Sequence, residues 1–194
     1  MWRINNYMRK YLIVGAGPVL IVLLSLLYDI NYPPKLSQVL KQAGENRGEL
    51  EFVLKHYKDK GNDLEYKAAV FLLENLKDKF HFEGQPVREY QEAFRSMSKR
   101  TLGQTRNLNE TWDSISESRN LNLGYVDKIY DVETLSSRML ISHIDAAFKA
   151  WRLPWARHLS YEDFCNEILP YKLSNEEPED WMSAIQKEYS WVVD

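Results

Sequence analysis

A single cysteine, Cys165, and two histidines upstream of it are the residues that could support nucleophilic chemistry. A thiol acts as a nucleophile when a base, usually histidine, lies within hydrogen-bond reach and is held in place by a third group. His158 precedes the cysteine by seven residues, His143 lies farther upstream, and no histidine follows. One hypothesis is therefore a thiol-dependent hydrolase or acyltransferase that uses Cys165 with His143 or His158. We favour the alternative that Cys165 is a small buried residue on the inner face of a short helix.

Three aromatic residues, Trp151, Trp155 and Tyr171, form a candidate binding set in the last quarter of the sequence. Exposed aromatic rings can stack on sugar rings or contact partner proteins, so a glycan- or protein-binding module is a further hypothesis. Aromatic residues at helical spacing more often belong to a core, and we favour the core interpretation.

The sequence predicts neither a metal site nor a cofactor. Its four histidines form no HExxH motif and no pair four residues apart, and no phosphate-binding glycine pattern is present. The whole chain of 194 residues has a net charge of −3, and the part after residue 28 has 22 basic against 28 acidic residues. Since nucleic-acid binding needs a basic face, we expect no nucleic-acid partner.

The elements that would position these side chains begin with an uncharged run at residues 11–28, YLIVGAGPVLIVLLSLLY. Eighteen helical residues span about 27 Å, close to the thickness of a bilayer's hydrocarbon core. Arg3, Arg9 and Lys10 precede the run and favour a cytoplasmic N-terminus. Residues 1–30 are therefore predicted to be a signal anchor that holds the rest of the chain outside the cytoplasmic membrane.

Cleavage of this segment is the alternative, and it would make the protein secreted. We favour an uncleaved anchor because the sequence after the run, SLLYDINYPP, has no small-residue cleavage pattern. In either case the domain would face the periplasm or the exterior.

The remaining sequence is predicted to be all-α, with the membrane-anchor helix followed by an irregular multi-helix domain. We expect a linker at residues 31–42, stiffened by two prolines, and a helical domain at residues 43–194. Within it, the segment 104–130 is rich in Asn, Ser and Thr and is expected to be irregular or mobile, although its apolar residues would fit a short helix.

Helical periodicity and capping residues give the expected helices. One ends at Gly61, and the next begins at Asn62, which with Glu65 resembles a capping box. A weaker helix is predicted at 86–103, a strong one ends at Trp151, and the last is predicted to begin near Asn175. Between the last two, Ser160 and Asp163 predict the start of a short helix, whose inward face carries Phe164, Ile168 and Leu169.

Two blocks, residues 43–76 and 131–181, contain longer motifs: ENRxELExVLxHY in the first, and SxEDFCxxILPY followed by EPxxW in the second. Together they resemble the N-terminal helical region of transglutaminase-like proteins of Bacteroidetes, over roughly 85 residues of the chain. The resemblance implies a papain-like catalytic core downstream of such a region, with Cys, His and Asp in that order.

The resemblance carries no catalytic residue over to this chain. Cys165 belongs to the helical SxEDFC motif rather than to the catalytic one, and no histidine follows it. We therefore expect a non-catalytic, extracytoplasmic accessory domain that supports or positions a papain-like core or contacts a partner in the cell envelope.

Overall fold

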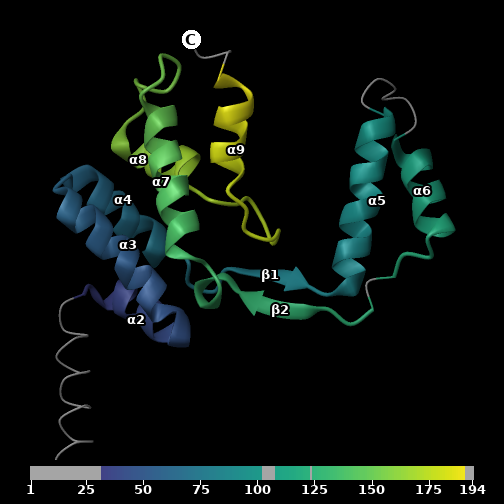
Figure 1. Ribbon diagram of the computed structural model, residues 1–194, viewed down its shortest axis with the longest axis horizontal. Helices are drawn as coiled ribbons and strands as arrows, with labels where there is room; N and C mark the ends of the chain where they lie inside the picture. The colour runs from purple at the N-terminus through teal and green to yellow at the C-terminus, as the bar shows by residue number, and fades with distance from the viewer. Residues whose placement is uncertain (1–31, 102–107, 123, 191–194) are drawn as a thin grey trace, which may run out of the picture.

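The computed structural model describes residues 32–101, 108–122 and 124–190, and these are mostly helical. Six helices form a body: α2 (Pro34–Gln42), α3 (Arg47–Lys60), α4 (Asp63–Glu74), α7 (Ser137–Trp151), α8 (Tyr161–Asp163) and α9 (Trp181–Glu188). The body also contains three short helical segments: η1 (Gly44–Asn46), η3 (Asp131–Glu133) and the π-helical η4 (Phe164–Ile168). An arm projects from this body and consists of β1 (Phe80–Glu83), α5 (Gln85–Thr101), α6 (Leu108–Ser118) and β2 (Asp127–Tyr130) (Figure 1).

No helix within the described ranges is both long enough and apolar enough to cross a membrane. The expected anchor at residues 11–28 lies outside those ranges.

The expected linker at residues 31–42 is wrong over most of its length, because α2 begins at Pro34 and runs to Gln42. Proline suits the first position of a helix, where its missing N–H would have no intrahelical partner. Three apolar residues of α2 are fully buried against the body: Leu36, Val39 and Leu40. The two prolines therefore start a core helix instead of spacing the domain from its N-terminal segment.

The predicted helices that meet at Gly61 and Asn62 are confirmed as α3 and α4, which pack against each other. Gly61 adopts a left-handed backbone, with φ of 71°, and ends α3. The side chain of Asn62 caps α4 by accepting hydrogen bonds from the backbone N–H groups of Leu64 and Glu65. Glu65 does not complete a capping box, because its buried carboxylate pairs with Lys60 at 2.7 Å.

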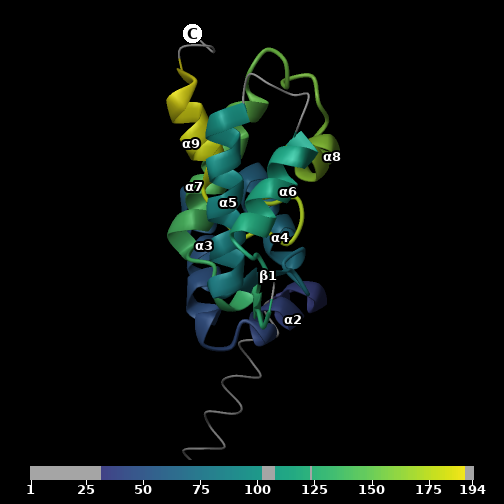
Figure 2. The ribbon, with the colours of Figure 1, turned by 90° about the vertical axis from the view of Figure 1, so that its right-hand side faces the viewer.

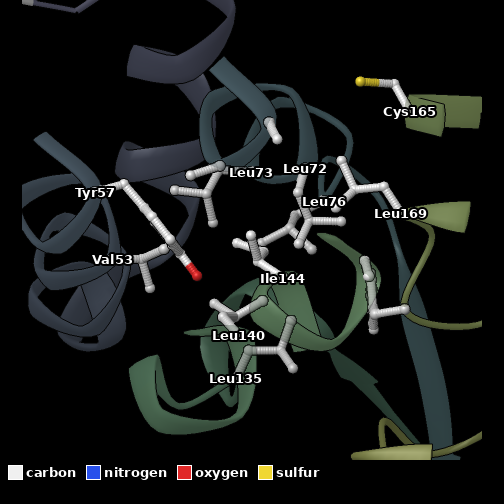
Figure 3. Close-up of a cluster of buried hydrophobic side chains, with 14 of the residues drawn as sticks. Val53, Tyr57, Leu72, Leu73, Leu76, Leu135, Leu140, Ile144, Cys165 and Leu169 are labelled. Atoms are coloured by element: carbon white, nitrogen blue, oxygen red, sulfur yellow. The ribbon is translucent and has the colours of Figure 1, made fainter. Parts of the chain in front are cut away.

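The core lies between α3, α4, α7 and the segment that follows α8 (Figure 3). Its buried side chains include Val53, Tyr57, Leu72, Leu73, Leu76, Leu135, Leu140, Ile144 and Leu169. On α3, α4 and α7 they recur at helical spacing, the pattern expected of helices that bury one face. The capping box of Ser160 and Asp163 is also confirmed, with Phe164, Ile168 and Leu169 buried behind it.

The all-α expectation is wrong at the arm, where β1 and β2 pair antiparallel with Phe80 opposite Tyr130 and Glu83 opposite Asp127. Each strand has only four residues, too few for an alternating pattern to stand out in the sequence. The ammonium of Lys128 lies 3.9 Å from the centre of the Phe80 ring and 4.8 Å from the centre of the Tyr130 ring.

The segment 104–130 is more regular in its described residues than expected, since it holds α6 and β2. α6 pairs with α5 as a helical hairpin at the far end of the strands, separated from the helices of the body in Figure 1; Figure 2, viewed from the side of the arm, shows the two helices in front of the body. Trp112 of α6 meets Tyr90 and Phe94 of α5, with ring centres 5.9 Å and 6.4 Å apart. These long-range contacts stabilise a helix that its polar sequence predicts only weakly.

The last helix begins at Trp181 instead of near Asn175. The carboxylate of Glu176 accepts hydrogen bonds from the backbone N–H groups of Leu173 and Ser174, which holds a turn where the helix was expected. Asp180 is tied to α7, because its carboxylate accepts a 2.6 Å hydrogen bond from Ser142.

Candidate functional site

Asp131 lies fully buried where the two strands join the body, and it is the centre of a polar cluster. Its carboxylate accepts a hydrogen bond from the Tyr171 hydroxyl and forms an ion pair with the Lys172 ammonium. The Nδ1 atom of His81 lies 2.8 Å from the same carboxylate. We call these four residues the Asp131 cluster. It links β1, η3 and the segment after η4, so it fixes the base of the arm to the body.

Hydrogen bonds around the Asp131 cluster satisfy its buried polar groups. The Lys172 ammonium also donates to the carbonyl of Phe80, at 2.8 Å, and to that of Glu176, at 3.4 Å. Burial, reinforced by the bond to Asp131, raises the pKa of Tyr171, so its hydroxyl stays protonated and keeps donating. A buried charge that is paired and hydrogen-bonded in this way is tolerated, whereas an unpaired one is not.

The His81 ring lies between two carboxylates, as the ring of a catalytic histidine can, but these contacts engage both of its nitrogens. Nδ1 faces Asp131, and Nε2 lies 3.1 Å from the carboxylate of Glu83. A general base needs one nitrogen directed at the proton that it removes. The contacts of His81 therefore hold the strands in place, and neither of its ring nitrogens is directed at a nucleophile.

Cys165, the candidate nucleophile, is buried, with 3% of its surface exposed. It borders a pocket of about 230 Å³, and no histidine is among the residues that line it: Phe71, Leu72, Asn75, Lys79, Cys165, Asn166, Pro170, Tyr171 and Lys172. Burial raises the pKa of the Cys165 thiol, against a smaller opposing effect of the Tyr161 hydroxyl. The thiol therefore stays protonated near neutral pH.

The two candidate bases are not brought to Cys165. His143 is fully buried, and its Nε2–H donates to the carbonyl of Leu169 at 2.9 Å, while Nδ1 has no hydrogen-bond partner. His158 is exposed in the turn between α7 and α8. The interpretation of Cys165 as a core residue therefore agrees with its surroundings.

His143 should make stability depend on pH. Burial lowers its pKa, although the Leu169 carbonyl and the Asp180 charge act in the opposite direction. Below about pH 6.5, the ordinary pKa of histidine, the unfolded chain binds a proton that the folded chain does not, so the free energy of unfolding falls as the pH falls. In urea unfolding of the full chain measured from pH 7.5 to pH 5, the free energy of unfolding should fall less steeply for His143→Gln than for the wild type.

His158→Gln is the matched control, because His158 is an exposed histidine. It should follow the wild-type pH dependence. If His143→Gln also did so, the buried imidazole would not be the source of the loss.

The three proposed contact aromatics do not share one exposed face. Trp151 is half-buried and stacks on Phe164 with ring centres 4.4 Å apart, and Tyr171 is buried in the Asp131 cluster. Trp155 is 61% exposed and lies in the turn after α7. Of the three, only Trp155 presents its ring to solvent.

A groove between the arm and the C-terminal segment was not foreseen from the sequence. Its volume is about 380 Å³, and its walls come from α5, from the segment after η4 and from the start of α9: Gln91, Tyr171, Lys172, Leu173, Glu176, Glu177, Glu179 and Trp181. Leu173 is 95% exposed at its edge, and the Trp181 indole N–H donates to the carbonyl of Tyr171 at 2.8 Å. The groove thus combines apolar contact surface with three glutamates.

No group of three or more His, Cys, Asp or Glu side chains in the described parts of the chain is arranged to hold a metal ion. Comparison of this chain with protein-family models, with curated proteins and with solved structures gave no match.

Proposed function

We propose that the chain is a non-catalytic, membrane-tethered helical domain that supports or positions a partner in the cell envelope. In this proposal residues 11–28 anchor the chain, and the described domain faces the periplasm or the exterior. The motifs at 43–76 and 131–181 favour a papain-like, transglutaminase-like catalytic core as the partner.

The observation that carries the proposal is the environment of Cys165. A thiol enzyme needs an accessible thiolate next to a base. Here the thiol is buried, its pKa is raised, and its pocket is lined without a histidine. His143 and His158 make contacts elsewhere or face solvent.

The shape of the domain also supports an accessory role. A hairpin that stands away from the body on two strands provides contact surface on several sides, and the Asp131 cluster fixes the base of those strands (Figure 1). Loop-rich or projecting elements on a rigid scaffold commonly carry binding functions.

An activity assay tests the proposal. The full chain in detergent should show no acyl transfer from glutamine-containing peptides to amines and no peptidase activity above the level of a Cys165→Ala variant. Cys165→Ala conserves the small apolar character of the site, so it should fold like the wild type. Turnover by the wild type that disappears in Cys165→Ala would replace the proposal with the thiol-enzyme hypothesis.

A further inference from the structure

A groove of about 650 Å³ lies along the side of α3 that faces away from the core. Its lining includes three aromatic and two basic side chains, which we call the α3 face: Tyr32, Phe52, Lys55, Lys58 and Tyr66. Phe52, Lys55 and Lys58 follow each other at three-residue spacing, so they share one side of the helix. The Phe52 ring is 56% exposed. An exposed ring that is flanked by two further rings and by basic residues indicates a contact surface.

The position of Tyr32 indicates what the α3 face contacts. This step rests on the proposed function, in which residues 11–28 anchor the chain. Tyr28 is the last residue of that run, and Tyr32 is four positions later. Four residues of backbone span at most about 14 Å. Because the headgroup layer of a bilayer is about 5–8 Å thick on each side, Tyr32 at the edge of the groove lies in or close to that layer.

The charges around the α3 face favour an anionic membrane surface. Arg47 pairs with Glu51 at 2.8 Å, and Lys55 pairs with Asp59 at 2.5 Å, so both carboxylates are neutralised. Lys58, in the last turn of α3, adds a positive charge to these two pairs. Aromatic rings are enriched at the level of the lipid headgroups, and basic side chains there are attracted to anionic lipids. The rings and cations of the α3 face therefore match the chemistry of a bilayer surface.

We propose that the α3 face lies on the bilayer surface, with Phe52 in the headgroup layer and Lys58 against anionic lipid headgroups. Figure 1 shows α3 and α4 at one edge of the body and the arm projecting from the opposite side, and Figure 2 shows the arm in front with α3 and α4 behind it. Contact through the α3 face therefore directs the α5–α6 hairpin away from the membrane. The bilayer then orients the domain as well as tethering it.

Fluorescence quenching in vesicles tests where Phe52 lies. The full chain, in a Cys165→Ala background, carries Phe52→Cys labelled with an NBD dye, in vesicles of phosphatidylcholine with about one third phosphatidylglycerol. Phe94→Cys, labelled in the same way, is the matched control, because Phe94 is 59% exposed on α5 of the arm. When a lipid with a nitroxide on its headgroup is included, the Phe52→Cys label should lose at least about half of its fluorescence and the Phe94→Cys label almost none.

Reversal of one charge tests the role of Lys58. In the labelled Phe52→Cys chain, Lys58→Glu should lower the ratio of docked to undocked domains about tenfold, because it replaces an attraction to the anionic surface with a repulsion. Lys149→Glu is the matched control, since Lys149 is also an exposed lysine in the last turn of its helix, and it should leave the ratio within about twofold. In vesicles of phosphatidylcholine alone, the two variants should behave alike.

Flotation of the vesicles separates this inference from the anchor on which it rests. The wild type and both charge variants should float with vesicles of either composition, because the anchor holds them. A chain that does not float with phosphatidylcholine vesicles would remove the anchor and the inference with it. Two results in floating chains would overturn the inference and leave the anchor standing: equal quenching of the Phe52→Cys and Phe94→Cys labels, or an effect of Lys58→Glu no larger than that of Lys149→Glu.

Discussion

Asp131→Asn should destabilise the folded chain by about 3–5 kcal/mol, a large part of the stability of a domain of this size. Asparagine keeps the shape of the side chain, but it removes the charge and leaves one acceptor oxygen where the carboxylate uses two, Oδ1 toward His81 and Oδ2 toward Tyr171. The Lys172 ammonium, buried with 2% of its side chain exposed, would then lack its counter-ion. Urea unfolding followed by tryptophan fluorescence measures the loss.

An exposed ion pair provides the matched control. Lys55 and Asp59 form a salt bridge on α3 with side chains 71% and 62% exposed. Asp59→Asn makes the same chemical change there and should cost at most about 0.5 kcal/mol, because exposed pairs contribute little.

A double-mutant cycle then separates the ion pair from the rest of the Asp131 cluster. In a Lys172→Met background, the loss in free energy of unfolding caused by Asp131→Asn should be at least about 1 kcal/mol smaller than in the wild type, because no buried ammonium is left unpaired. If the two substitutions were additive, or if Asp131→Asn were no worse than Asp59→Asn, the cluster would not be what fixes the arm to the body.

The helices of the body could be predicted from the sequence because each buries one face. Leu50, Val53, Leu54 and Tyr57 repeat at helical spacing, and all four are buried in α3. Capping residues predicted helix boundaries, as at Gly61 and Ser160, because a cap depends on residues that are close in the sequence. Near Asn175 the same reasoning failed, because the Glu176 side chain holds a turn that the sequence pattern does not reveal.

Elements that depend on distant partners could not be predicted. β1 and β2 are four residues long and lie more than forty residues apart, so neither has a pattern of its own. α6 is a polar helix that owes its packing to Trp112 against α5. In α2, the prolines were interpreted as a spacer, although its apolar residues are spaced for burial.

The Asp131 cluster was missed because its four members are dispersed along the sequence and meet only through the fold. One signal was available: Asp131 stands between Tyr130 and Val132, and Lys172 stands between Tyr171 and Leu173, so each charge interrupts an apolar run. A single charge in such a run near a predicted core suggests a buried partner of opposite sign. The prediction that Cys165 is not a catalytic nucleophile rested on chain order, because no histidine follows the cysteine in the sequence.

The reactivity of Cys165 has the second large expected effect. Alkylation needs the thiolate and access to the sulfur. Burial limits access and also raises the thiol's pKa, so reaction in the folded chain should require local opening. We expect iodoacetamide to modify the folded chain at pH 7.5 at least about a thousandfold more slowly than the urea-unfolded chain, in keeping with an opening free energy above about 4 kcal/mol.

The measurement is unambiguous because Cys165 is the only cysteine in the sequence. Intact mass spectrometry of the full chain, sampled over time in native buffer and in urea, gives both rate constants. A ratio near or above a thousand supports a domain without a working nucleophile. Alkylation of the folded chain as fast as, or faster than, that of the unfolded chain would mean an exposed, activated thiolate and would contradict the proposed non-catalytic role.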